Sequence, residues 1–135
     1  MSLVNFSPTA HPCIDNPITR WHVAHGWCYN AVDVRSGNFL GVFYVTLLCA
    51  DGGIIHFDTC SSVPPALILS GFRKALRMVL PHLAVVYATV PAGSIGLVRV
   101  LKKLGFRVVP EGGFVVDSRE ILLLKYFNKQ NAIFL

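Results

Sequence analysis

The stretch SIGLVRVLKKLGF, residues 94–106, has the pattern of an amphipathic helix followed directly by a strand. Ser94 is a residue type favoured at a helix N-cap, and Gly105 stands where a left-handed C-terminal cap belongs. The stretch therefore predicts a helix over residues 94–104 that packs on a sheet through one apolar face. That face comprises Leu97, Val100, Leu101 and Leu104.

The residues before this stretch predict a second helix and a buried strand. Apolar residues recur at helical spacing from Leu69 to Leu80, and Pro64-Pro65 suits the start of a helix because a first-turn proline loses no helical hydrogen bond. Pro81 ends that helix. The continuous apolar run Leu83–Val90 has the length of a strand and is best placed in the middle of a sheet that is covered on both faces.

Strand patterns fill most of the remaining chain. Three runs separated by turns, 28–34, 39–48 and 54–58, predict an antiparallel meander. Two more, 106–109 and 121–127, follow the 94–104 helix. This order of elements predicts an α/β fold of the α+β kind, with a mixed, mostly antiparallel sheet and two main helices packed on it.

The composition suits one domain with an unusual surface. The chain has 135 residues, of which 53% are apolar and only 14% are charged, whereas about a quarter of the residues of an ordinary domain are charged. We therefore expect a homo-oligomer or a protein partner to cover apolar surface. Residues 1–20 contain three prolines and predict an irregular N-terminal arm, in which Leu3–Phe6 is an alternative edge strand. The arm and the Trp21–Trp27 segment are the expected contact elements.

The cysteines and the hydropathy pattern indicate a cytoplasmic protein without a membrane span. The four cysteines show no CxxC pair, which favours free thiols in a reducing compartment. The first residues lack the basic start of a signal peptide. The uncharged stretch Met78–Val98 is broken by Pro81 and Pro91, so it is not expected to span a membrane. The cluster Trp21, His22, His25 and Trp27 favours packing over metal binding, and no metal site is predicted.

Residues 94–106 resemble the fourth-helix motif of the GNAT superfamily of N-acyltransferases. The ending Lys103-Leu104-Gly105-Phe106 matches that motif fully, and the order of elements from Cys28 to Phe127 also fits. The resemblance implies a single GNAT-like domain and an acyl-CoA cofactor. It places the cofactor-binding positions at Thr59, Cys60, Ser61, Ser62, Val63 and Ser94.

Several residues depart from the family pattern. Ser94 replaces the usual Asn, Leu97 a small residue, and Leu101 the Tyr that protonates the departing thiolate of coenzyme A. The segment 59–66 lacks the glycines that let backbone N–H groups surround a pyrophosphate, and its two prolines cannot donate. These departures predict weak or absent binding of acetyl-CoA. A reduced loop and a Leu at this position also resemble small GNAT-like proteins of tailed bacteriophages, some of which travel in the virion.

The third predicted strand carries the candidate catalytic residues. His56 and Asp58 are two apart, so they share one face of the sheet, and this is the strand that often supplies a general base in GNAT enzymes. The alternative is a pair that is satisfied by local hydrogen bonds. Cys60 ends this strand and is either an acyl acceptor or a small buried side chain.

Basic residues dominate the two helices. Residues 59–110 contain seven basic residues and no acidic one, and the net charge of the chain is +5. The pattern favours either an anion-facing surface for a cofactor, nucleic acid or acidic protein, or two ordinary solvated helix faces. The residues of the candidate anion-facing surface are Arg73, Lys74, Arg77, Arg99, Lys102 and Lys103.

Two functions therefore remain. The first is a divergent GNAT-fold protein that serves as a non-catalytic binding or structural component, encoded by a phage. The alternative is an acetyl-CoA-dependent N-acetyltransferase that acts on a small amine or a protein amine. The missing glycines and the missing Tyr favour the first.

Overall fold

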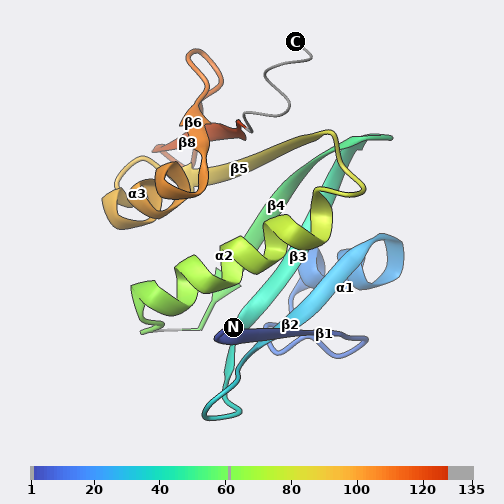
Figure 1. Cartoon of the computed structure of the whole chain (residues 1–135). Coiled ribbons are helices and arrows are strands. Elements are labelled where there is room, and N and C mark those ends of the chain that lie inside the picture. The colour runs from blue at the N-terminus through green and yellow to red at the C-terminus, as the bar shows by residue number, and fades with distance from the viewer. Residues whose placement is uncertain (1, 61, 128–135) are drawn as a thin grey trace.

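The computed structural model describes residues 2–60 and 62–127 (Figure 1). Within these residues the elements follow one another in the order strand, helix, three strands, helix, strand, helix, three strands. Their bounds are β1 (Val4–Pro8), α1 (Pro17–His25), β2 (Trp27–Asp33), β3 (Phe39–Cys49), β4 (Gly52–Thr59), α2 (Pro65–Val79), β5 (Val85–Pro91), α3 (Ile95–Leu104), β6 (Phe106–Val108), β7 (Phe114–Val116) and β8 (Arg119–Tyr126).

The strands form a single mixed sheet. Its order among the described residues is β1-β2-β3-β4-β5-β8-β6, and β7 pairs with the start of β8. Strands β4 and β5 are parallel, while the other described pairs are antiparallel. The predicted mixed, mostly antiparallel sheet is confirmed. The run at 83–90 is a central strand, because β5 lies between β4 and β8.

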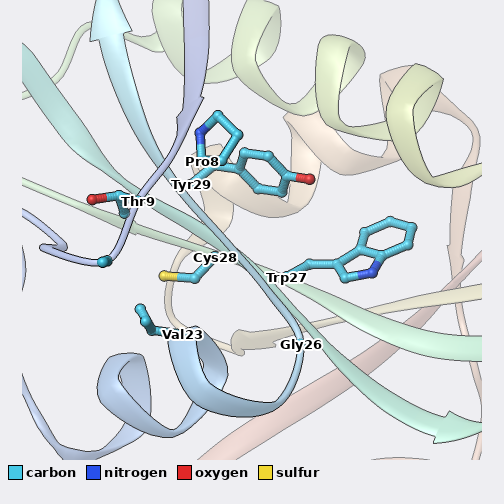
Figure 2. A pocket seen from close by; sticks show the side chains of 8 residues that line it. Pro8, Thr9, Val23, Gly26, Trp27, Cys28 and Tyr29 are labelled. Atoms are coloured by element: carbon cyan, nitrogen blue, oxygen red, sulfur yellow. The ribbon is translucent and has the colours of Figure 1, made fainter.

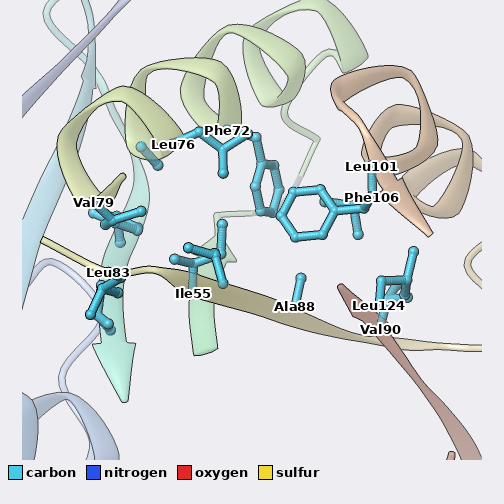
Figure 3. Close-up of a cluster of buried hydrophobic side chains, with 14 residues drawn as sticks. Ile55, Phe72, Leu76, Val79, Leu83, Ala88, Val90, Leu101, Phe106 and Leu124 are labelled. Carbon is cyan, nitrogen blue, oxygen red and sulfur yellow. The ribbon is translucent and has the colours of Figure 1, made fainter. Parts of the chain in front are cut away.

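Helices α2 and α3 cover one face of the sheet and build the main core (Figure 3). Phe72, Leu76 and Val79 of α2 are buried in this core together with Leu101 of α3. The periodicity that predicted both helices therefore marks the faces that are buried. On the sheet side the core is completed by Phe43, Val45, Ile55, Val86, Ala88, Val90, Phe106 and Leu124.

The α3 motif behaves largely as predicted. Leu101 is buried, and Leu97 and Leu104 pack against the main core. Gly105 adopts a left-handed conformation with φ of 110°, and its N–H is donated to the Leu101 and Lys102 carbonyls. Ser94 occupies the N-cap position, but its hydroxyl accepts no capping hydrogen bond, so the predicted capping role of that side chain is wrong.

The N-terminal arm is more regular than predicted. Residues 4–8 form β1, which pairs antiparallel with β2, so the alternative of an edge strand is confirmed over part of its range. The helix α1 begins within the arm, at Pro17, and the prediction of irregular structure is wrong there. The Asn16 side chain accepts the Thr19 N–H, and the Thr19 hydroxyl accepts the Asn16 N–H. Asn16-Pro17 was the available sequence signal, since Asn favours the N-cap and Pro the first helical position.

Helix α1 covers the opposite face of the sheet from α2. Val23 of this helix packs with Cys13 and Ile14 on a small cluster formed by Cys28, Val42 and Tyr44. These strand residues alternate along the chain with Tyr29, Phe43 and Val45, which face the main core. No helix in the described part of the chain is long and apolar enough to cross a membrane.

Candidate functional site

The candidate site begins where two central strands separate. Strands β4 and β5 pair only from Gly52–Ile55 to Val85–Ala88. Beyond this point β4 pairs with β3 alone, and β5 pairs with β8 alone. The two strands therefore diverge toward their carboxyl ends. Residues 56–59 of β4 and residues 89–91 of β5 do not pair with each other, so backbone groups on the facing edges of the two strands lack a strand partner.

A groove extends from the diverging end of β4 between α2 and α3. A cavity of about 270 Å³ lies between Phe57 and Thr59 of β4, Pro65 and Phe72 of α2, and Leu97 of α3. A more open hollow of about 620 Å³ adjoins it, since both are lined by Pro65 and Val100. Apolar side chains dominate the groove, so it suits an extended, largely apolar ligand segment.

Only part of the candidate anion-facing surface borders this groove. Arg99, Lys102 and Lys103 of α3 line the open hollow, whereas Arg73 and Arg77 are exposed on α2. Lys74 has a structural role instead. Its Nζ atom donates to the Val4 carbonyl at 3.0 Å and to Asn5 Oδ1 at 3.2 Å, which ties α2 to β1.

The first turn of α2 offers few hydrogen-bond donors to an anion. Pro64 and Pro65 have no N–H group, and the N–H groups of Leu67 and Ile68 are both donated to the Pro64 carbonyl, at 3.0 and 3.2 Å. Among the described residues this leaves the N–H of Ala66 as the first-turn donor without a partner. The N–H groups at the helix start are therefore absent or mostly bonded within the helix, and they do not form a row of free donors for a phosphate.

The loop before α2 contributes little to the groove. Thr59 lines the smaller cavity, but Cys60, Ser62 and Val63 do not line either hollow of the groove, and Ser61 lies outside the described residues. Ser62 has a positive φ of 65°, which a β-carbon disfavours. Ser94 does not line either hollow. Of the five predicted cofactor-binding residues that the structure describes, Thr59 alone lines these two hollows.

His56 and Asp58 lie on the opposite face of the sheet from the groove. They alternate along β4 with Phe57 and Thr59, and they sit beside Tyr44 on the face that α1 covers. The Tyr44 hydroxyl donates to Asp58 Oδ2 at 3.0 Å, and the Tyr44 ring stacks on His56 at 4.7 Å between centroids. The sequence placed the two residues on one face, but Tyr44 as their partner was not foreseen.

A chain of hydrogen bonds links His56 to α1. His22 Nδ1 lies 2.7 Å from the Ile18 carbonyl, which can only accept, so neutral His22 carries its proton on Nδ1. Its Nε2 then accepts from the Thr46 hydroxyl at 2.8 Å, and Thr46 Oγ1 in turn accepts from His56 Nε2 at 3.2 Å. In the neutral state His56 is therefore protonated on Nε2, and its Nδ1 has no partner within the described part of the chain.

Burial makes His56 a weak base. Loss of solvent lowers the pKa of His56 to about 4, an effect that Asp58 opposes and His22 reinforces. The same change of environment, together with Asp58, raises the pKa of Tyr44. At neutral pH His56 is uncharged and has an unshared pair on Nδ1. Its low pKa gives it little driving force to accept a proton from an amine.

The sequence matches no family model and no curated protein, but the structure resembles many solved acetyltransferases. A chimera of the Vibrio cholerae spermidine N-acetyltransferase SpeG superposes with a TM-score of 0.73 at 11% identity, over 97% of this chain and 99% of that one. An IAA acetyltransferase from Bacillus cereus gives a TM-score of 0.69 at 13% identity, with 93% and 99% covered. A GNAT family acetyltransferase from Elizabethkingia anophelis with acetyl-CoA bound gives 0.63 at 10% identity, with the same coverage.

The fold is the GNAT fold. Identities this low establish the architecture alone, because one fold hosts many functions. The fold supports the expectation from residues 94–106, and the divergence of β4 and β5 lies beside the helix that this motif forms.

Leu101 occupies the GNAT motif position where the family often has Tyr. It is 1% exposed and belongs to the main core with Phe106 and Leu124. An apolar side chain at this position has no proton to deliver. Nothing at Leu101 can therefore protonate a leaving thiolate.

The remaining candidates lie outside the groove. Within the described residues no group of three His, Cys, Asp or Glu side chains is arranged to hold a metal ion. In the Trp21–Trp27 segment, Trp21 stacks on His25 at 4.7 Å and is 52% exposed, while His22 is buried. Trp27 lines a separate hollow of about 370 Å³ with Tyr29, Cys28 and Val23, at the end of β1 (Figure 2).

Proposed function

We propose that this protein is a divergent GNAT-fold component that acts by binding a partner and does not catalyse efficient acyl transfer. The observation that carries the proposal is the first turn of α2. A ligand phosphate there meets two prolines without an N–H group, then the free N–H of Ala66, and then Leu67 and Ile68, whose N–H groups are bonded to the Pro64 carbonyl. The start of α2 thus offers a phosphate one free N–H group, that of Ala66, among the described residues.

Two further features support a non-catalytic role. Leu101 is buried and cannot act as an acid. His56 is hydrogen-bonded through Thr46 to His22, and its lowered pKa makes it a poor proton acceptor. Both positions are filled by side chains that stabilise the fold, and neither side chain suits proton transfer in an acyl-transfer reaction.

We expect wild-type protein to bind acetyl-CoA with a dissociation constant of about 100 µM or weaker. Each charge-assisted hydrogen bond that is missing removes roughly 1.5–3 kcal/mol, so two of them weaken binding by on the order of a hundredfold or more. The exposed lysines and arginines of α3 recover part of this loss through contacts that salt screens. Isothermal titration calorimetry at low and at physiological salt measures both effects.

A matched pair of variants tests the cause. Pro64→Gly combined with Pro65→Ala returns two N–H groups to the start of α2, and we expect it to tighten acetyl-CoA binding by on the order of a hundredfold. Pro81→Ala replaces an exposed proline beyond the other end of α2 and should leave binding unchanged. Low-micromolar binding by the wild-type protein would contradict the proposal.

A second function is favoured by the groove itself. An acetyl-CoA-dependent N-acetyltransferase needs a slot for an extended acyl carrier, and the diverging β4 and β5 open into an apolar groove bordered by Arg99, Lys102 and Lys103. The residues at the groove suit the apolar part of the cofactor, while the start of α2 does not suit its phosphates. In such an enzyme a small amine or a protein amine would bind on the opposite face of the sheet, where His56 Nδ1 would receive its proton, and would meet the acyl group at the gap between β4 and β5.

A thiol-release assay separates the two functions. With acetyl-CoA and a panel of amines, the binding proposal predicts release at the uncatalysed rate and no effect of His56→Gln. The enzyme alternative predicts turnover that falls by on the order of a hundredfold in His56→Gln. Circular dichroism of both proteins checks that the variant is folded.

The expected partner is a protein or a second copy of the chain. Ile18 and Trp21 are 56% and 52% exposed on α1, which supports the prediction that this segment contacts a partner. The basic residues of α3 favour an anionic partner surface. The resemblance of the reduced loop and of Leu101 to small phage proteins supports an origin in a phage-infected bacterial cell, with a cytoplasmic or virion location.

Sedimentation analysis tests the partner surface. If α1 mediates self-association, Trp21→Glu should lower the average mass toward that of the 14.8 kDa monomer. His11→Glu, an exposed change outside α1, should leave the mass unchanged. A monomeric wild-type protein over a wide concentration range would exclude a second copy as the partner.

A further inference from the structure

Two cysteines that are far apart in the sequence meet at the same point of β3. The Cys13 thiol donates to the Gly41 carbonyl at 3.2 Å. The Cys60 N–H donates to the neighbouring Leu40 carbonyl at 2.8 Å. Gly41 also pairs with Thr59, the residue before Cys60, so the Cys60 segment runs beside the carbonyl that the Cys13 thiol contacts. The two cysteine residues therefore meet beside the end of β4.

The backbone around both cysteines is held in place. The Cys13 N–H donates to Asn30 Oδ1 at 2.8 Å, and Asn30 Nδ2 donates to the His11 carbonyl at 3.2 Å, so two hydrogen bonds fasten residues 11–13 to β2. Cys60 directly follows Thr59, which pairs with Gly41. A disulfide needs β-carbons close together, and these anchors keep the two segments adjacent.

We propose that Cys13 and Cys60 form a disulfide when the protein meets a peroxide, and that this pair is a redox modification site. The proposal is independent of whether the protein binds acetyl-CoA. All four cysteines are free in the structure, so the reduced form is the starting state. Both partners are partly exposed, which gives the oxidant access.

The chemistry balances with one molecule of hydrogen peroxide. The Cys60 sulfur, after losing its proton, attacks one peroxide oxygen; the O–O bond breaks, and the departing hydroxide takes up a proton to become water. The Cys13 sulfur then attacks the resulting sulfenic acid, forms the S–S bond and releases a second water. Two thiols are oxidised and the peroxide is reduced. Burial and the neighbouring Cys60 thiol raise the pKa of Cys13, which disfavours Cys13 as the first nucleophile, so the first step is assigned to Cys60.

The other two cysteines are poorer partners. Cys28 packs in the cluster beneath α1 and is 6% exposed, so a peroxide does not reach it readily. Cys49 is exposed at the far end of β3, where its thiol lies 3.5 Å from Asp51 Oδ1. Oxidation at Cys49 is therefore expected to link two molecules rather than two segments of one.

The bond would join the segment before α1 to the loop before α2. It would close a loop of roughly 50 residues, which restricts the unfolded chain and should raise the melting temperature by on the order of 10 °C. Since Cys60 directly follows Thr59, which lines the groove, the bond would also restrain the end of β4. Oxidation thus has a stability readout that does not depend on any ligand.

The test uses the full chain with Cys49→Ser as background, treated with hydrogen peroxide at neutral pH. After free thiols are alkylated, peptide mapping without reductant should find Cys13 linked to Cys60, in a protein two hydrogens lighter. The melting temperature should rise and return with dithiothreitol. Cys13→Ser and Cys60→Ser should each abolish both changes, while Cys28→Ser should leave them. A Cys13–Cys28 bond, or only sulfinic products in the folded background protein, would overturn the proposal.

Discussion

Replacing Gly41 with alanine should destabilise the protein by about 3 kcal/mol. Gly41 has a φ of 156° and lies opposite Thr59 in the β3–β4 pair. A β-carbon added there would stand 2.1 Å from the Asp58 carbonyl oxygen and 2.8 Å from the Thr59 α-carbon. Both are backbone atoms of the paired strand, so relief requires that β3 and β4 move apart.

Urea denaturation followed by circular dichroism measures this effect. Gly93→Ala is the matched control, because an added β-carbon at Gly93 meets nothing within 4 Å, and its change should stay within about 0.5 kcal/mol. If Gly41→Ala were as stable as the wild type, β3 and β4 would not approach each other as closely at Gly41 as the structure shows. It would also remove the support for the placement of Cys60 beside Gly41.

Lowering the pH from 7 to 4 should destabilise the fold by about 3 kcal/mol through His56 alone. The pKa of His56 is about 4 in the folded protein and close to 6.5 in the unfolded chain. Between pH 4 and pH 6.5, His56 is protonated in the unfolded state but stays mostly neutral in the folded state. The folded state therefore has its full stability with respect to His56 above pH 6.5, and the free energy of unfolding decreases as the pH falls toward 4.

Denaturation curves at several pH values measure how the free energy of unfolding changes with pH. His56→Gln should reduce the dependence on pH between 6.5 and 4, while His11→Gln, at an exposed position, should leave it as in wild type. A histidine resonance of His56 that titrates near pH 6.5 in nuclear magnetic resonance spectra would contradict the assignment. It would also restore His56 as a base matched to neutral pH.

The candidate site was only partly accessible to sequence reasoning. Alternation along a strand placed His56 and Asp58 on one face, because side chains of a strand point to its two sides in turn. Their partners Tyr44, Thr46 and His22 come from β3 and α1, and no spacing in the sequence relates them to β4. Lys74 was predicted as part of an anion-facing surface, whereas its contacts with β1 depend on how α2 packs.

Elements with local signals could be predicted from the sequence. The apolar face of residues 94–104, the glycine after it and the buried run at 83–90 are patterns that require burial wherever the chain places them, and α3 and β5 follow. The two prolines before α2 likewise remove donors in any tertiary arrangement. Helix α1 was missed because it is nine residues long and has a weak apolar pattern, so packing on the sheet stabilises it more than propensity does.

Tertiary structure alone decided which distant groups meet. The divergence of β4 and β5 and the meeting of Cys13 with the Cys60 segment arise from contacts between segments that are far apart in the sequence. His56 has its lowered pKa because residues of β3 and α1 bury it. Sequence patterns report which face of an element is buried, because burial repeats with the period of that element. Sequence patterns do not show which neighbouring element covers that face, and the chemistry of this site depends on those neighbours.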